Sequence, residues 1–148
     1  MRIVPSVFVV LGLVFLLIGP IKVFGILEDP NYLGFGNALL PMVSNRVVFL
    51  TVGILEIALG IYLVFSRRLV IKAVFLLWFV VSAVTYKIGL AFIDYESPCS
   101  CLSGFSKFIK FSRVAESYVS DTILVVSLFA ALSVLLADFF GTGRRNAI

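Results

Sequence analysis

Apolar residues dominate four stretches of this chain, and most charged residues fall between them or at their ends. The four stretches cover about residues 6–27, 46–65, 69–93 and 118–140. Each is roughly twenty residues or longer, and about twenty residues of α-helix span a hydrocarbon core roughly 30 Å thick. The pattern therefore predicts an all-α protein, an integral membrane four-helix bundle that forms a single domain over residues 1–148.

Two longer segments, residues 28–45 and 94–117, connect the predicted helices as loops. In the second segment, Phe105, Phe108 and Ile109 share one helical face, and the basic residues fall mostly on the opposite face. A helix with this pattern lies in the headgroup plane of a membrane. We therefore predict a short amphipathic interfacial helix before the last transmembrane helix.

The composition agrees with a membrane protein, because 61% of the 148 residues are hydrophobic and only 14% are charged. Soluble domains are nearer about 45–50% apolar and about 25% charged. A chain this short cannot bury so many apolar side chains within itself, so a lipid bilayer must surround it. The net charge is +4, but the basic residues cluster at helix ends. The positive-inside rule explains that placement without a nucleic-acid partner.

Basic residues also predict the orientation of the bundle. One side carries Arg2, Arg67, Arg68, Lys72, Arg144 and Arg145, and the other carries Arg46, Lys107, Lys110 and Arg113. This excess favours both termini in the cytoplasm and both long loops outside, as in a bacterial inner membrane. A signal peptide is the alternative interpretation of residues 6–27, but this run is longer than the roughly 7–15 residues of a signal-peptide core.

Cys99 and Cys101 are the only cysteines and lie in the second loop, on the predicted outer side, where disulfides persist. A bridge across one residue closes a tiny, strained ring, which stabilises little and suits thiol–disulfide exchange. The alternatives are a structural bridge, two inert thiols, or two ligands of a metal site that other groups would complete. The chain has no histidine, so imidazole ligands and histidine bases are excluded, and we expect no metal site.

Four ionisable side chains fall within the predicted spans, namely Lys22, Glu56, Lys87 and Asp121. A charge in hydrocarbon costs at least about 2.5–3.5 kcal/mol, so such groups face the bundle interior and find partners. We expect an intramembrane polar cluster beneath the cysteine loop, which would serve as a proton or quinone site. The alternatives are ion pairs that only set the register of the helices, or lysines that reach the interface unpaired.

Several short motifs point to one family. The first helix carries Gly19-Pro20-Ile21-Lys22, followed by Asp29-Pro30, and the second carries Glu56 four residues before Gly60. Cys99-Ser100-Cys101 precedes the last helix, which Asp121 opens. Together these motifs resemble the MauE/DoxX-like family of small redox-associated membrane proteins, although Leu102-Ser103-Gly104 replaces that family's usual Phe-Gly. The resemblance implies a four-helix bundle tied to thiol or disulfide metabolism, which helps to mature a periplasmic partner.

The leading hypothesis is a membrane thiol–disulfide redox protein in which Cys99 and Cys101 support maturation of a periplasmic partner. A quinone is the candidate cofactor. Whether the chain is itself an oxidoreductase is left open, because quinone-linked oxidases usually use two cysteine pairs and this chain has one. The alternative is a non-catalytic accessory subunit of a larger membrane complex, with the cysteines as a structural disulfide. A small-molecule carrier is a third interpretation, although four helices leave little room for alternating access.

Overall fold

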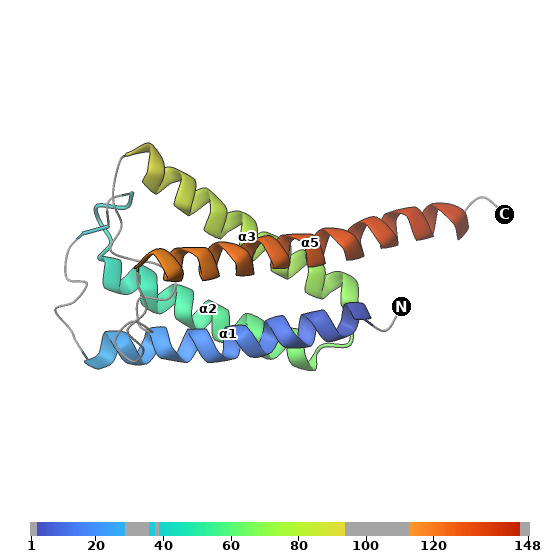
Figure 1. Cartoon of the computed structure of the whole chain (residues 1–148), viewed down its shortest axis with the longest axis horizontal. Coiled ribbons are helices and arrows are strands. Elements are labelled where there is room, and N and C mark those ends of the chain that lie inside the picture. Colours follow the sequence, from blue (N-terminus) through green and yellow to red (C-terminus); the bar gives the residue numbers. More distant parts are fainter. Residues whose placement is uncertain (1–2, 29–35, 38, 94–112, 146–148) are drawn as a thin grey trace.

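The computed structural model describes residues 3–28, 36–37, 39–93 and 113–145 of the chain. This part contains four α-helices, which are α1 (Ile3–Glu28), α2 (Asn45–Phe65), α3 (Leu69–Phe92) and α5 (Arg113–Arg145). Successive helices run in opposite directions, so α1 starts at the end of the bundle where α5 ends (Figure 1). Each helix contains a segment of 21 to 24 residues that is apolar enough to cross a membrane. The predicted all-α, four-helix membrane fold is confirmed over these residues.

The helix boundaries follow the predicted spans closely at the short turn and less closely elsewhere. α2 and α3 begin and end within one residue of the predicted limits, whereas α1 begins three residues early. α5 extends beyond the predicted span at both ends, so the second loop ends before Arg113. Hydropathy marks only the part of a helix that lies in hydrocarbon, and polar residues continue it further. Most of the predicted amphipathic interfacial helix falls in residues 94–112, outside the described residues.

Glycines bring α1 and α2 into close contact. A Cβ atom added at Gly60 would lie 2.8 Å from the carbonyl oxygen of Gly12, and one at Gly19 would lie 2.8 Å from that of Gly53. Both distances are shorter than real Cβ contacts, so only glycine allows the two backbones to approach this closely. The two glycines of each helix are two turns apart and share one face. Gly53 and Gly60 of α2 therefore form a close helix contact with Gly12 and Gly19 of α1.

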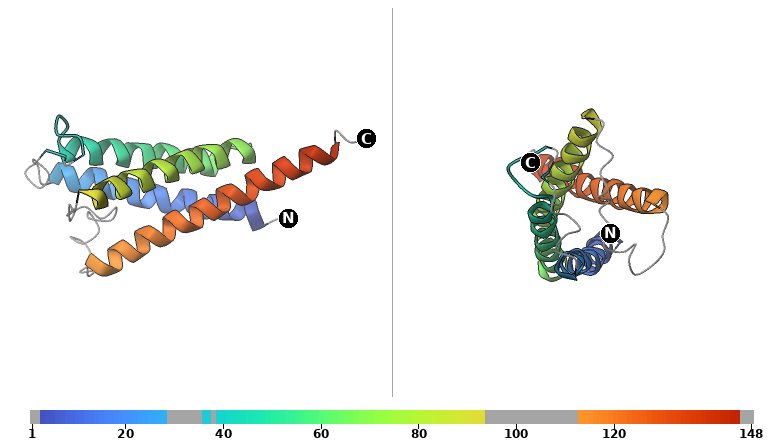
Figure 2. Two further views of the ribbon diagram at one scale, coloured as in Figure 1. Left: turned by 90° about the horizontal axis from the view of Figure 1, so that it is seen from above. Right: turned by 90° about the vertical axis from the view of Figure 1, so that its left-hand side faces the viewer.

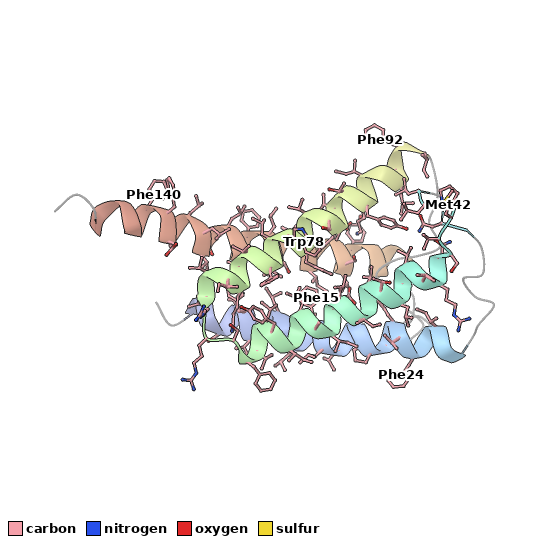
Figure 3. All side chains as sticks on the ribbon, turned by 180° about the vertical axis from the view of Figure 1, so that it is seen from behind. Phe15, Phe24, Met42, Trp78, Phe92 and Phe140 are labelled. Atoms are coloured by element: carbon pink, nitrogen blue, oxygen red, sulfur yellow. The ribbon has the colours of Figure 1, made fainter. Side chains whose placement is uncertain are left out.

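The second close pair of helices is α3 and α5, whereas α2 and α3 diverge from the turn at residues 66–68 (Figures 1 and 2). The apolar core lies at the end of the bundle that holds this turn. Its most buried members are Phe8, Leu63, Ala73, Leu76, Val80 and Ala131. Phe15 meets Phe79 edge to face, with ring centroids 5.4 Å apart. By contrast, Phe24, Phe92 and Phe140 project outward, as side chains in contact with lipid do (Figure 3).

Polar groups satisfy both ends of α2. At its start, the Ser44 hydroxyl accepts a hydrogen bond from the backbone N–H of Val47, at 3.4 Å. At its end, the carbonyl of Leu63 belongs to the last turn and has no partner within the helix. The ammonium of Lys72, which is buried at the start of α3, donates a hydrogen bond to this carbonyl. Lys72 therefore holds the turn between α2 and α3.

Candidate intramembrane polar site

The four ionisable residues predicted within the spans form two separate ion pairs. Lys22 of α1 pairs with Glu56 of α2, and Lys87 of α3 pairs with Asp121 of α5. Each pair therefore joins the two helices of one closely packed couple. The first is buried, with side-chain exposures of 2% and 5%, whereas the second is 35% and 55% exposed. The structure thus divides the predicted cluster into a buried pair and a partly exposed pair.

The glycine contacts explain why the first pair is buried. Lys22 follows Gly19 by three residues and Glu56 follows Gly53 by three, so both charged groups lie one turn from the same close contact. A Cβ atom at Gly53 would lie only 3.4 Å from the Cβ of Lys22. The approach of the two backbones therefore brings the ammonium and the carboxylate together and excludes lipid. Because desolvating two charges is expensive, such a pair persists only when both partners remain in place.

The hydrogen-bonding capacity of the buried pair is only partly used. An ammonium has three N–H donors, and that of Lys22 has one described partner, Oε1 of Glu56. The second carboxylate oxygen, Oε2, is buried and has no hydrogen-bond partner among the described residues. Most buried polar atoms in proteins are paired, so an unpartnered one calls for an explanation. Lys87 is better satisfied, because it also contacts the hydroxyl of Ser120 at 3.3 Å.

A network around Asn37, which the sequence reasoning missed, attaches the first loop to α3. The side-chain amide of Asn37 donates to Oδ1 of Asn45 at 2.9 Å and to the hydroxyl of Tyr86 at 2.7 Å. Its carbonyl accepts from the backbone N–H groups of Leu39 and Leu40, at 2.9 and 3.1 Å. All four hydrogen-bonding positions of this buried side chain are therefore used. The only signal in the sequence was a polar residue within a segment too apolar for a free loop.

A cavity of about 230 Å³, here called the Lys22 cavity, lies where α2 and α3 diverge. Its polar lining comes from Lys22, Ser82, Tyr86 and Lys87. Its apolar lining is Val48, Phe49, Val52, Leu55, Trp78, Phe79, Ala83 and Leu90. The lysines of the two ion pairs therefore line a single cavity. Among the described residues, neither lysine forms an ion pair with the acid of the other pair. The four residues predicted to form one cluster are therefore two separate ion pairs beside a common cavity.

A second cavity of about 290 Å³, here called the Tyr62 cavity, adjoins the first. It is lined by Leu55, Ala58, Leu59, Tyr62, Phe75, Trp78 and Phe79. Leu55, Trp78 and Phe79 line both cavities, so the two lie side by side along the face between α2 and α3, and together they are here called the path. The path has polar groups at one end and apolar side chains along the rest. Such an arrangement can hold a hydrogen-bonding group inside the membrane beside an apolar chain.

The predicted reactive cysteines, Cys99 and Cys101, lie in residues 94–112, outside the described residues. Their redox state and their distance from the ion pairs therefore stay predictions. Within the described part of the chain, no group of three or more histidine, cysteine, aspartate or glutamate side chains is placed to hold a metal ion. The described residues that form the two ion pairs and the polar lining of the Lys22 cavity provide the chemistry of lysine, carboxylate, tyrosine and serine.

Comparisons with family models, curated proteins and solved structures found no match to this chain. The resemblance to the MauE/DoxX-like family therefore rests on the short sequence motifs alone.

Proposed function

We propose that this chain is a membrane thiol–disulfide redox protein in which Cys99 and Cys101 exchange electrons with a periplasmic protein and support its maturation. The observation that carries the proposal is where the cysteine segment joins the bundle. α3 ends at Phe92, five residues after Lys87, and α5 reaches Asp121 eight residues after its start. The helix ends on either side of residues 94–112 therefore lie within a few turns of the Lys87–Asp121 pair, which supports a link between thiol chemistry and groups that can hold a proton.

The reaction requires an electron acceptor. When the two thiols close to a disulfide, they lose two electrons and two protons, and both must be taken up elsewhere. A quinone takes up two electrons and two protons and becomes a quinol, so the proposal includes a membrane quinone as the acceptor. The disulfide then passes to a thiol pair of the periplasmic partner, which regenerates the dithiol of this chain. The proposal also places the protein in a bacterial inner membrane with both termini in the cytoplasm.

Trapping free thiols in intact membranes tests the proposal. We expect a mixture of reduced and oxidised Cys99–Cys101 that shifts toward the dithiol after a reductant and returns after added quinone. Replacing either cysteine by serine should abolish maturation of the partner and leave insertion of the protein unchanged. Ser100→Ala is the matched control, since it changes the residue between the cysteines and keeps both thiols. A pair that stays fully reduced or fully oxidised under all conditions would contradict exchange.

A second candidate function is a non-catalytic accessory subunit of a larger membrane complex. The observation in its favour is α5, whose carboxyl-terminal end extends past the other helices (Figures 1 and 2). This end exposes Phe139 and Phe140, which contact each other edge to face. The cysteines would then form a static disulfide. Purification of the full chain inside a stable assembly, together with a permanently oxidised cysteine pair, would favour this function over exchange.

A further inference from the structure

We infer that the Lys22 cavity binds a membrane quinone, with the ring between Phe49, Trp78 and Phe79 and the carbonyl oxygens toward Lys22 and Tyr86. The role of this quinone as an electron acceptor rests on the proposed function, whereas its binding rests on the cavity itself. The ligand follows from three properties of the described residues: unused hydrogen-bond donors, balanced charge, and an apolar path for a chain.

The polar end of the cavity has more donors than acceptors. The buried ammonium of Lys22 has one partner among the described residues, so two of its three N–H groups have no described acceptor. The Tyr86 hydroxyl accepts a hydrogen bond from Asn37, and its own hydrogen has no acceptor among the described residues. The hydroxyl of Ser82 already donates to the carbonyl of Trp78. A ligand that offers acceptor oxygens and no donors therefore complements this end of the cavity.

The charge of the site selects a neutral ligand. Lys22 is paired with Glu56, and Lys87 is paired with Asp121, so each ammonium already has its counter-charge. A carboxylate or phosphate head would bring an additional charge into the low-dielectric interior without a free partner, which is strongly unfavourable. A carbonyl group accepts hydrogen bonds and carries no charge. The described groups therefore favour a quinone over a fatty acid or the headgroup of a phospholipid.

The shape of the path fits a flat ring that carries one chain. Phe49 of α2 and Trp78 and Phe79 of α3 provide aromatic faces on both walls of the Lys22 cavity. The Tyr62 cavity continues from the shared residues Leu55, Trp78 and Phe79, and its lining is apolar apart from the Tyr62 hydroxyl. Volumes of about 230 and 290 Å³ fit a ring and the first part of its chain. Each cavity alone is smaller than the about 300–1,000 Å³ of a drug-sized ligand site, so a ring with a chain would occupy both.

Trp78 lies between the cavities and the outer surface of the bundle, and its fluorescence provides a probe of ligand binding. It lines both cavities and is 64% exposed, so a ligand dissolved in the bilayer reaches the path from this side. Figure 3 shows its place midway along α3. It is also the only tryptophan of the chain, so its fluorescence reports on this position alone.

Titration of the purified full-length protein with a short-chain quinone, followed by Trp78 fluorescence, tests the inference. We expect saturable quenching that neither a fatty acid nor a phospholipid reproduces or displaces. Tyr86→Phe should weaken quinone binding about tenfold through the loss of one donor, and Tyr118→Phe should leave it unchanged. Ala83→Leu, which fills the cavity, should abolish saturation, whereas Ala91→Leu on the exposed face of α3 should not.

Other outcomes overturn the inference. Quenching that never saturates, or that is equal in Ala83→Leu and Ala91→Leu, would show that the quinone dissolves in the detergent or lipid around Trp78. Displacement by a fatty acid at similar concentration would assign the cavity to an acyl chain. If Ala83→Leu fails to fold, which circular dichroism reveals, the comparison of Tyr86→Phe with Tyr118→Phe decides in its place, and equal affinities there overturn the inference.

A variant with both cysteines replaced by serine separates this inference from the proposed function. Saturable quenching should persist in it, because the inferred binding contacts come from described residues of α1, α2 and α3. If quinone binds while the cysteine pair of the wild type never changes its redox state, the quinone site is supported and the exchange function is contradicted. If the cysteine pair changes its redox state while quinone does not bind, the quinone site is contradicted, and the exchange function requires another oxidant.

Discussion

The two closely packed helix pairs of this protein each contain a lysine–acid ion pair, but they bury its charges to different extents. Both join a lysine of one helix to an acid of the next inside a predicted membrane span. Between α1 and α2, facing glycines let the backbones meet and bury the Lys22–Glu56 pair. Between α3 and α5, the Lys87–Asp121 pair stays partly exposed. Two ion pairs of similar chemistry therefore differ in energetic weight, because burial determines how much the loss of one partner costs.

The acids and the lysines of the two ion pairs also have different places relative to the Lys22 cavity. The acids Glu56 and Asp121 balance the charge of the lysines but do not line the Lys22 cavity, whereas Lys22 and Lys87 do. Each acid therefore acts on the cavity through its lysine. Changes at the acids should alter stability in proportion to burial, and changes at Tyr86 or Ala83 should alter the binding of a ligand.

The largest expected effect is at Glu56. Glu56→Ala leaves Lys22 charged and buried without a partner, so we expect a loss of about 3–5 kcal/mol in the free energy of unfolding. Thermal or denaturant unfolding in detergent measures the change. The matched test is the exchange of both charges, Lys22→Glu with Glu56→Lys, which should recover part of the loss. A Glu56→Ala protein as stable as the wild type would show that the pair is not buried in the folded protein.

The glycine contact should give the next largest effect. Gly60→Ala places a methyl group 2.8 Å from a backbone carbonyl of α1, and we expect a loss of about 1–3 kcal/mol as the helices move apart. Gly89→Ala is the control, because its methyl group would meet only the flexible side chain of Leu39. Removing a helical glycine there should change stability little or raise it by about 0.5–1 kcal/mol. Equal destabilisation by both variants would contradict a special contact between α1 and α2.

The smallest effect is expected at the exposed pair. Asp121→Asn removes the counter-charge of Lys87, but both residues lie near the ends of their predicted spans and are 35% and 55% exposed, so the headgroup region is within reach of the lysine. We expect a change of about 0–1 kcal/mol in the same unfolding measurement. A loss as large as that of Glu56→Ala would mean that both pairs are equally buried and would remove the distinction between the two regions.

The sequence alone determined the number of helices, their approximate spans and the membrane environment. In hydrocarbon every backbone N–H and C=O needs an internal partner, so a long apolar run has few alternatives to a helix. The same reasoning predicted that charges within the spans find partners. These conclusions depend only on local composition and on the solvent around the chain.

Only the tertiary structure decided which groups meet. Composition does not distinguish a pairing of Lys22 with Glu56 from one with Asp121, because that choice depends on which helices pack together. Lys72 belongs by sequence to a basic membrane end, yet its ammonium is buried against the carbonyl of Leu63. Asn37 and Tyr86 are 49 residues apart in the chain and share a hydrogen bond. The cavity between α2 and α3 exists because these helices diverge, and a divergence angle is a property of packing that no local pattern records.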